Sequence, residues 1–276
     1  MSVADKVFIT MCKDILKNGI SSQGEKVRAK WEDGTPAHTI KKFGIVNRYN
    51  LSEEFPILTL RPTNLKAAID EIFWIWQKKS NNIKDLNSHI WDSWADQDGS
   101  IGKAYGYQLR IKHKYPEGEF DQVDRALYDL KHNPYSRRII VNLYNHNDLH
   151  EMNLYPCAYS MTFNVAGKKL NAILNQRSQD ILVANNWNIC QYAILVQIFA
   201  QVSGLEAGEL VHVIADAHIY DRHLPLIEDL IQRTSYPAPK LLINQDVKDF
   251  YDFKVDDFKL EGYQSGPQIK KIPVAI

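Results

Sequence analysis

Hydrophobic and polar residues follow two different periods along this chain, and the changes of period predict where helices and strands lie. Apolar residues recur at helical spacing in residues 1–19 and again in residues 63–77. A third helix is predicted in residues 121–132, before an Asn-Pro pair. Residues 189–203 are apolar nearly all round, which predicts a buried central helix.

The remaining apolar runs are predicted to be strands. Residues 40–60 contain short strand-like stretches that Gly44 and Pro56 are expected to break. Residues 153–177 form a hairpin with its turn at residues 166–168, and residues 211–220 form a buried strand. No repeat and no Pro/Gly/Ser-rich linker divides the chain, so we expect one domain over residues 1–276.

The hairpin carries the first candidate chemistry. Cys157 stands directly after Pro156 at the head of one strand, and Arg177 follows the end of the other. Two paired strands of this length would bring the thiol and the guanidinium together, and a nearby positive charge favours a nucleophilic thiolate. The alternative is a small buried cysteine with no chemical role.

Composition narrows the classes of protein that fit. Lysine plus arginine equals aspartate plus glutamate, 33 of each, so no basic surface indicates nucleic acid and a bound anion needs a local arginine cluster. Three widely spaced cysteines predict neither a disulfide framework nor a metal site, and favour the reducing cytoplasm. The most apolar run is too short to span a bilayer, and the N-terminus lacks the layout of a signal peptide.

Further polar residues in apolar surroundings have a structural and a functional interpretation. Glu71 lies among apolar helix neighbours, where burial would raise its pKa and suit it to carry protons. Asn188 either caps the following helix or pairs with a planar amide through its donor and acceptor. His218 and Tyr220 lie two residues apart on one strand face, although a lone histidine there is more often structural.

Two more segments fit either interpretation. Arg137 and Arg138 directly precede an apolar strand. They are either solvent-exposed residues at the edge of a sheet or ligands of a phosphate group, whose oxygens match the bidentate donors of arginine. The cluster containing Trp91 and Trp94 is typical of a core, and Tyr105 lies in a glycine-flanked loop that is weak evidence alone.

Taken together in chain order, these segments resemble the thymidylate synthase family. The resemblance rests on Pro156-Cys157, Gln176-Arg177-Ser178, Asp180, Asn188 and residues 216–220, and it extends over almost the whole chain. The other matching segments are the Gly34-Thr35 loop, residues 71–74, Trp91-Asp92 with Trp94, Tyr105-Gly106, residues 136–138, residues 250–252 and residues 273–276.

The resemblance implies an α/β (α+β) fold in which helices flank a large mixed sheet, and a homodimer formed through that sheet. It implies methylation of 2′-deoxyuridylate (dUMP) to thymidylate (dTMP), with 5,10-methylenetetrahydrofolate giving carbon and hydride and leaving as dihydrofolate. No metal, membrane or nucleic acid is implied.

It also implies roles for the catalytic residues. Cys157 attacks C6 of uracil, and Arg177 stabilises its thiolate while holding the phosphate. Glu71 serves the enolate at O4, and Tyr105 belongs to the network that removes the C5 proton. Asn188 donates to O4 and accepts from N3–H, so it selects uracil over cytosine.

The implied binding residues fall into three groups. Gln176, Ser178, Arg137 and Arg138 serve dUMP and its phosphate, and the two arginines come from the partner subunit. His218 and Tyr220 bind the 3′-hydroxyl. The residues implied to contact folate are Ile90, Trp91, Asp180, Trp187 and Ala275, with Asp180 counted among the catalytic residues as well.

Three positions depart from the family's usual pattern. The loop arginine that many members direct at the phosphate is absent from residues 33–36, so Arg28 or Lys30 is expected to replace it. Ala158 stands where many members have histidine after the cysteine, and Trp187 changes the floor of the folate pocket.

Three alternatives stay open at this point. A pyrimidine-nucleotide hydroxymethylase would use the same thiolate and folate but add water instead of hydride. A hydrolase would pair Cys157 with His218, and a non-catalytic protein would only bind the nucleotide.

Overall fold

The computed structural model describes residues 1–276, which fold around one seven-stranded sheet. The strands are β1 (Ile20–Ser21), β2 (Thr39–Asn50), β3 (His113–Tyr115), β4 (Gly118–Phe120), β5 (Ile140–Asn142), β6 (Ala158–Ala166), β7 (Lys169–Gln176), β8 (Gln179–Asp180), β9 (Glu206–Tyr220), β10 (Lys240–Ile243) and β11 (Phe258–Glu261). The helices are α1 (Val3–Asn18), α2 (Leu65–Trp76), α3 (Gly106–Leu109), α4 (Gln122–His132), α5 (Asn185–Val202) and α6 (Leu224–Leu230).

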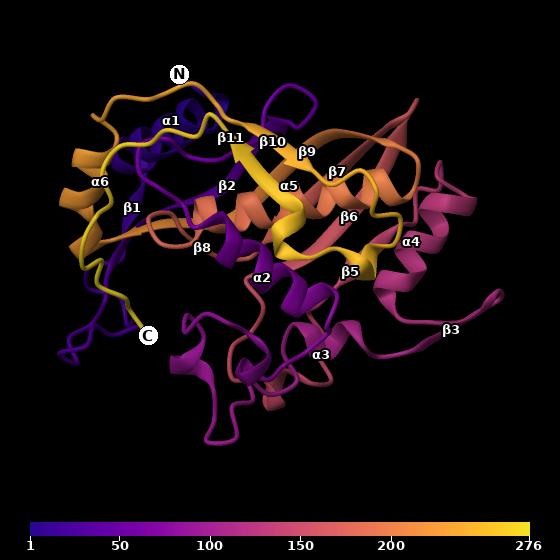
Figure 1. The fold of residues 1–276 in the computed structure, drawn as a ribbon. Helices are drawn as coiled ribbons and strands as arrows, with labels where there is room; N and C mark the ends of the chain where they lie inside the picture. Colours follow the sequence, from indigo (N-terminus) through magenta and orange to yellow (C-terminus); the bar gives the residue numbers. More distant parts are fainter.

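The main sheet follows the order β1-β2-β9-β7-β6-β5, and β8 also pairs with β9 (Figure 1). Neighbouring strands run antiparallel except that β7 and β8 each lie parallel to β9. Two small hairpins, β3-β4 and β10-β11, lie outside it. The mixed sheet flanked by helices that the resemblance implied is therefore confirmed.

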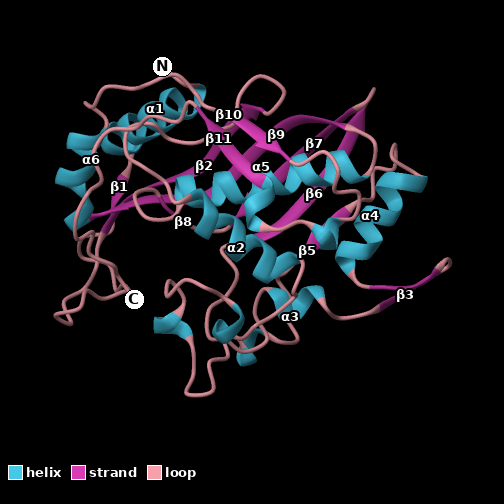
Figure 2. Cartoon of the chain, in the orientation of Figure 1, coloured by secondary structure: helices cyan, strands magenta, loops and turns pink.

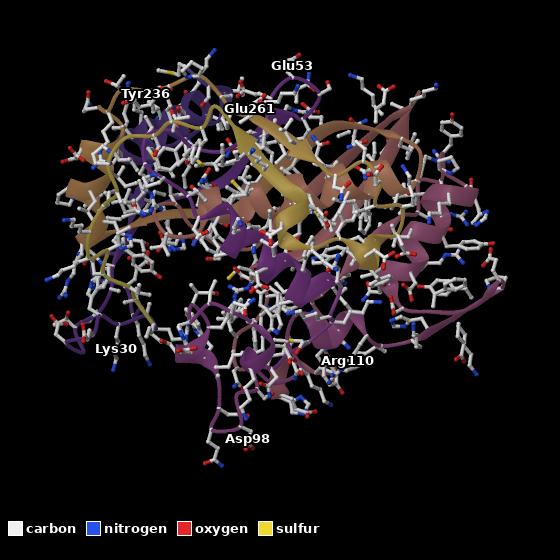
Figure 3. All side chains as sticks on the ribbon, viewed as in Figure 1. Lys30, Glu53, Asp98, Arg110, Tyr236 and Glu261 are labelled. Carbon is white, nitrogen blue, oxygen red and sulfur yellow. The ribbon has the colours of Figure 1, made fainter.

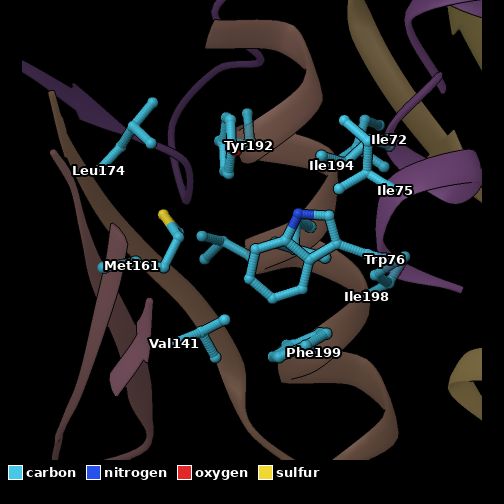
Figure 4. Close-up of a cluster of buried hydrophobic side chains, with 14 of the residues drawn as sticks. Ile72, Ile75, Trp76, Val141, Met161, Leu174, Tyr192, Ile194, Ile198 and Phe199 are labelled. Carbon is cyan, nitrogen blue, oxygen red and sulfur yellow. The ribbon is translucent and has the colours of Figure 1, made fainter. Parts of the chain in front are cut away.

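The core lies between this sheet and the helices α2 and α5. Both helices contact each other, and α5 also contacts β7 and β9. Figure 4 shows Trp76 at the centre of this cluster, between α2, α5 and the sheet. Its ring lies edge-on to Tyr192 at 6.3 Å and to Phe199 at 6.0 Å. Residues 189–203 were predicted to form a central helix because they are apolar on every side, and this packing explains that pattern.

The opposite face of the sheet carries a cross-strand row in which Val211 is buried but Ile173 and Ile140 are exposed. Val211 lies opposite Ile173, which lies opposite Thr162 on β6, and Thr162 lies opposite Ile140. Cross-strand partners point to the same face, so these residues form one row. Ile140 is 53% exposed. Val46 on β2 pairs with Val213, two residues beyond Val211 on β9, and is 54% exposed.

Two predicted boundaries were wrong. Gly44 does not break its strand: its φ of +75° is accommodated within β2, and pairing with β9 continues on both sides. The helix predicted to begin at Ile189 begins at Asn185, so Asn188 lies in its first turn and donates its backbone N–H to Ala184. Asn188 is therefore not the helix cap.

Loops dominate the segment between α2 and α3 (Figure 2). This segment contains Trp91 and Trp94, whose rings pack at 5.7 Å, and it ends at Tyr105. The hairpin β3-β4 extends away from the rest of the chain (Figure 1).

Candidate active site

The predicted hairpin brings Cys157 and Arg177 together. Cys157 directly precedes β6 and Arg177 directly follows β7, and the backbone N–H of Arg177 donates to the Cys157 carbonyl at 2.9 Å. The guanidinium is held by the carbonyls of Pro156 and Tyr155, at 3.0 and 2.7 Å. Its Nη2 lies 3.7 Å from the Cys157 Sγ, so the cation is fixed beside the sulfur.

The ionisation of Cys157 reflects a balance between burial and charge. Burial raises the pKa of the Cys157 thiol. Arg177 is the largest of the groups that lower this pKa, followed by the Tyr105 hydroxyl and Arg28. Burial outweighs them, so the net shift of the Cys157 pKa is upward, while the cations fixed beside the sulfur favour its thiolate.

Tyr105 is held against Cys157 by an unusual backbone. Its φ is +46°, a left-handed value that costs a non-glycine residue about 1–3 kcal/mol. The next residue, Gly106, passes so close to Ser80 that a Cβ would lie 2.1 Å from the Ser80 carbonyl oxygen. The Tyr105 hydroxyl accepts the Cys157 backbone N–H at 3.0 Å, and burial raises the pKa of this hydroxyl well above its usual value.

Glu71 is a buried carboxyl group on α2 with two indole donors. Trp91 Nε1 donates to Oε1 at 2.9 Å, and Trp187 Nε1 donates to Oε2. Burial raises the pKa of Glu71 to about 7, against smaller lowering effects from Trp187, Trp91 and Gln191. The carboxyl group therefore exchanges its proton near neutral pH.

Asn188 on α5 lies in a network of side-chain amides. Its Oδ1 accepts from Gln176 Nε2 at 3.3 Å, and its Nδ2 donates to Gln191 Oε1 at 3.0 Å. Gln191 lies in the same apolar helix and was not predicted as a site residue. The available signal was that a polar residue on a helix that is apolar nearly all round is expected to be buried and to need a hydrogen-bond partner.

Asp180, His218 and Tyr220 come from β8 and the end of β9. The Asp180 Oδ1 accepts the backbone N–H groups of Leu182 and Val183 at 2.9 and 3.0 Å, which fixes the carboxylate. The His218 and Tyr220 rings lie 5.0 Å apart, as their two-residue spacing predicts. His218 Nδ1 lies 2.7 Å from an Asp216 carboxylate oxygen.

One cavity of about 520 Å³ contains most of the predicted site residues. Those that line it are Glu71, Ile90, Trp91, Tyr105, Cys157, Arg177, Ser178, Asp180, Trp187, Asn188, His218, Tyr220 and Ala275. The structure thus brings together residues that are separated by up to 204 positions, because the sheet, α2 and α5 converge there.

Four of the residues considered for the site lie elsewhere. Gln176 is buried behind Asn188 and does not line the cavity. Arg137 and Arg138 are exposed just before β5, outside the cavity of their own chain. Lys30 exchanges backbone hydrogen bonds with Ile276, at 2.8 and 2.9 Å, and its side chain does not line the cavity; Figure 3 shows it at the lower left, in the region of the C-terminus.

Two cations line the cavity besides Arg177. Arg28, one of the two expected replacements for the loop arginine, is among the lining residues. Arg61 was not predicted as a site residue. The available signal in the sequence was its position as a single arginine at the end of an apolar run. Its Nη2 donates to the Leu182 carbonyl at 2.5 Å, and burial lowers its pKa while Asp180 opposes this effect.

No three His, Cys, Asp or Glu side chains are grouped as metal ligands. None of the helices has the combination of length and hydropathy that crossing a bilayer requires.

Comparison with known proteins accounts for the whole chain. A family model described as thymidylate synthase matches residues 6–276. The thymidylate synthase of Bacillus mojavensis is 46% identical over 274 residues, and thymidylate synthase 1 of Bacillus subtilis (strain 168) is 45% identical over 274, each match covering 98% of both chains.

A solved structure leads to the same family. The thermostable thymidylate synthase A from Bacillus subtilis is 44% identical, superposes with a TM-score of 0.94, and is matched over 99% of both chains. The chain therefore belongs to the thymidylate synthase family, and it is a methyltransferase that converts dUMP to dTMP.

Proposed function

We propose that residues 1–276 act as one domain whose cavity carries out this methylation with Cys157 as the nucleophile. The observation that carries the proposal is that Cys157, Arg177, Glu71 and Asn188 line one cavity, with the guanidinium 3.7 Å from the sulfur. Uracil C5 is a weak nucleophile until a group adds to C6, and a thiolate is a suitable soft nucleophile for that addition.

Proton handling is assigned to Glu71 and Tyr105. Addition at C6 develops negative charge at O4, which needs a hydrogen-bond donor or a proton. Glu71, whose pKa is about 7, is matched to this task at neutral pH. Tyr105 bonds the Cys157 backbone and lies in the same cavity, which supports its part in removing the C5 proton.

Base recognition is assigned to Asn188. With one lone pair and one N–H engaged by Gln176 and Gln191, its amide keeps one acceptor and one donor free. These match the N3–H and O4 of uracil. Gln176 acts by holding Asn188 rather than by touching the nucleotide.

The phosphate is assigned to Arg28, Arg177 and Ser178 of one subunit, and to Arg137 and Arg138 of a second. The exposed side chains of Ile140, Ile173 and Val46 on the sheet support a homodimer formed through that face. Both arginines are exposed just before the edge strand β5, where a partner's cavity can recruit them. His218 and Tyr220 are assigned to the 3′-hydroxyl of the sugar.

The folate co-substrate, 5,10-methylenetetrahydrofolate, fits the remaining wall of the cavity. Ile90, Trp91 and Trp187 offer flat apolar surface for a fused ring, and the fixed Asp180 carboxylate can accept from its N–H groups. When bound, this molecule supplies the one-carbon unit and the hydride. Ala275, in the C-terminal segment that lines the cavity, would exclude water. All three cysteines are unpaired, which supports the reducing cytoplasm as the location.

Product analysis tests this function. The protein is incubated with dUMP and methylenetetrahydrofolate, and dTMP is quantified beside the absorbance rise of dihydrofolate. Equal amounts of the two products are expected. A hydroxymethylated nucleotide without dihydrofolate would instead identify the hydroxymethylase, since water would have replaced the hydride; no observation on the chain favours that alternative or a hydrolase.

A further inference from the structure

A buried chain of hydrogen bonds runs behind the cavity and ends at a histidine that the reaction does not use. His212 Nε2 on β9 bonds Gln176 Oε1 at the end of β7, and Gln176 Nε2 donates to Asn188 Oδ1 at 3.3 Å. Asn188 Nδ2 then donates to Gln191 Oε1 at 3.0 Å, and Gln191 Nε2 donates to the Ala68 carbonyl at 3.2 Å. His212, Gln176 and Gln191 are all buried.

The direction of this chain is fixed at its α2 end. A backbone carbonyl only accepts, so Gln191 must turn its NH₂ group to Ala68 and its oxygen to Asn188. Gln191 also lowers the pKa of Glu71, as an amide N–H near the carboxyl group does, which agrees with this orientation. Asn188 must therefore present Nδ2 to Gln191 and Oδ1 to Gln176.

The direction is fixed again at the β9 end. Gln176 gives its NH₂ group to Asn188, so its oxygen faces His212 and needs a donor there. His212 Nε2 must carry a proton, because Nδ1 is buried without a partner and a buried N–H is rarely left unbonded. Burial lowers the pKa of His212 to about 3, so the ring is neutral and donates through Nε2 alone.

We propose that His212 is a positioning residue that sets the pyrimidine preference of the enzyme by holding the Gln176 and Asn188 amides in one orientation. The inference rests on the proposed role of Asn188 as the base-reading residue.

The orientation of the Asn188 amide matters because its two possible orientations match different bases. In the observed orientation the cavity receives a lone pair and an N–H that match N3–H and O4 of uracil. Exchanging the oxygen and nitrogen of Asn188 would match cytosine, whose N3 accepts and whose 4-amino group donates. The exchange would also set two oxygens together at Gln191 and two NH₂ groups together at Gln176. The intact series of hydrogen bonds from His212 to Ala68 therefore opposes the exchanged orientation of Asn188.

The test compares the binding of dUMP and dCMP to the full-length protein by calorimetry. His212→Leu removes the donor, and the ratio of the dCMP to the dUMP dissociation constant is expected to fall about tenfold, which corresponds to about 1.4 kcal/mol. His212→Gln retains an N–H for Gln176 and is expected to restore most of the ratio. Because the two nucleotides share sugar and phosphate, general loosening of the site would weaken both and leave the ratio unchanged.

Two further variants control the comparison. Asn47→Leu is the matched control, because Asn47 lies directly opposite His212 on β2 and is buried, but its side chain bonds Met11 instead of the chain of amides. Its ratio should stay that of the wild type. Gln176→Glu keeps the acceptor for His212 and removes the donor to Asn188, so it should lower the ratio even where His212→Leu does not fold.

Asn188→Asp separates this inference from the proposed function. A shift of this variant toward dCMP supports base reading by Asn188. If it shifts while His212→Leu and Gln176→Glu keep the wild-type ratio within twofold, the role of His212 is overturned and that of Asn188 stands. An unchanged ratio in Asn188→Asp overturns both.

Discussion

Replacing Glu71 by glutamine removes a buried carboxyl group whose ionisation the folded protein resists. Its pKa is about 7 in the folded state, against 4.5 for an unperturbed glutamate. Between these two values the folded state keeps a proton that the unfolded chain releases, so rising pH favours unfolding. The contribution of Glu71 to stability is therefore complete below pH 4.5 and is lost as the pH rises to about 7.

The size of this effect follows from the two pKa values. The difference between 4.5 and about 7, at 1.36 kcal/mol per pH unit, corresponds to about 3 kcal/mol of unfolding free energy. Glutamine does not titrate, so Glu71→Gln lacks this dependence. It also turns an NH₂ group toward Trp91 or Trp187, both of which donate, so its stability at any single pH carries an additional cost.

The assay is urea unfolding of both proteins from pH 4.5 to 8 at one protein concentration. We expect the unfolding free energy of the wild type, minus that of Glu71→Gln, to fall by about 3 kcal/mol over this range and to level off above pH 7. A difference that stays constant with pH would refute the raised pKa, and with it the assignment of Glu71 as a proton carrier at neutral pH.

Two further predictions concern the phosphate. Arg28→Ala should raise the KM for dUMP about tenfold or more, because a charge-assisted bond is lost, whereas Lys30→Ala should leave it near the wild-type value; equal effects in steady-state assays would contradict the assignment of Arg28. Chains carrying Arg137→Ala with Arg138→Ala, mixed equally with Cys157→Ser chains, should regain about a quarter of wild-type turnover, because half the dimers hold one intact site. Inactive hybrids, verified as heterodimers, would argue against shared sites.

Local patterns predicted much of this structure. The hairpin holding Cys157 and Arg177 follows from strand alternation around a Gly turn, and α2 follows from apolar spacing that also marked Glu71 as unusual. These features depend on contacts close in sequence, which is why pattern alone could find them.

The failures came where long-range contacts decide. Gly44 is a strand breaker by propensity, yet pairing with β9 carries β2 through it. Asn188 has the residue type of a helix cap, but α5 begins before it. The choice between Arg28 and Lys30 depends on how one loop folds over a cavity whose walls come from distant segments. His212 is one polar residue in an apolar strand, and only its contact with Gln176 distinguishes it from a structural histidine.

The most direct test of the account is turnover and nucleotide binding in Cys157→Ser, with Cys190→Ser as the matched control because Cys190 is buried in α5 outside the cavity. We expect Cys157→Ser to lose turnover and tritium release from C5-labelled dUMP by on the order of 10⁴-fold or more while it still binds dUMP, and Cys190→Ser to keep both activities. Appreciable turnover by Cys157→Ser would contradict the claim that this thiol attacks the uracil ring.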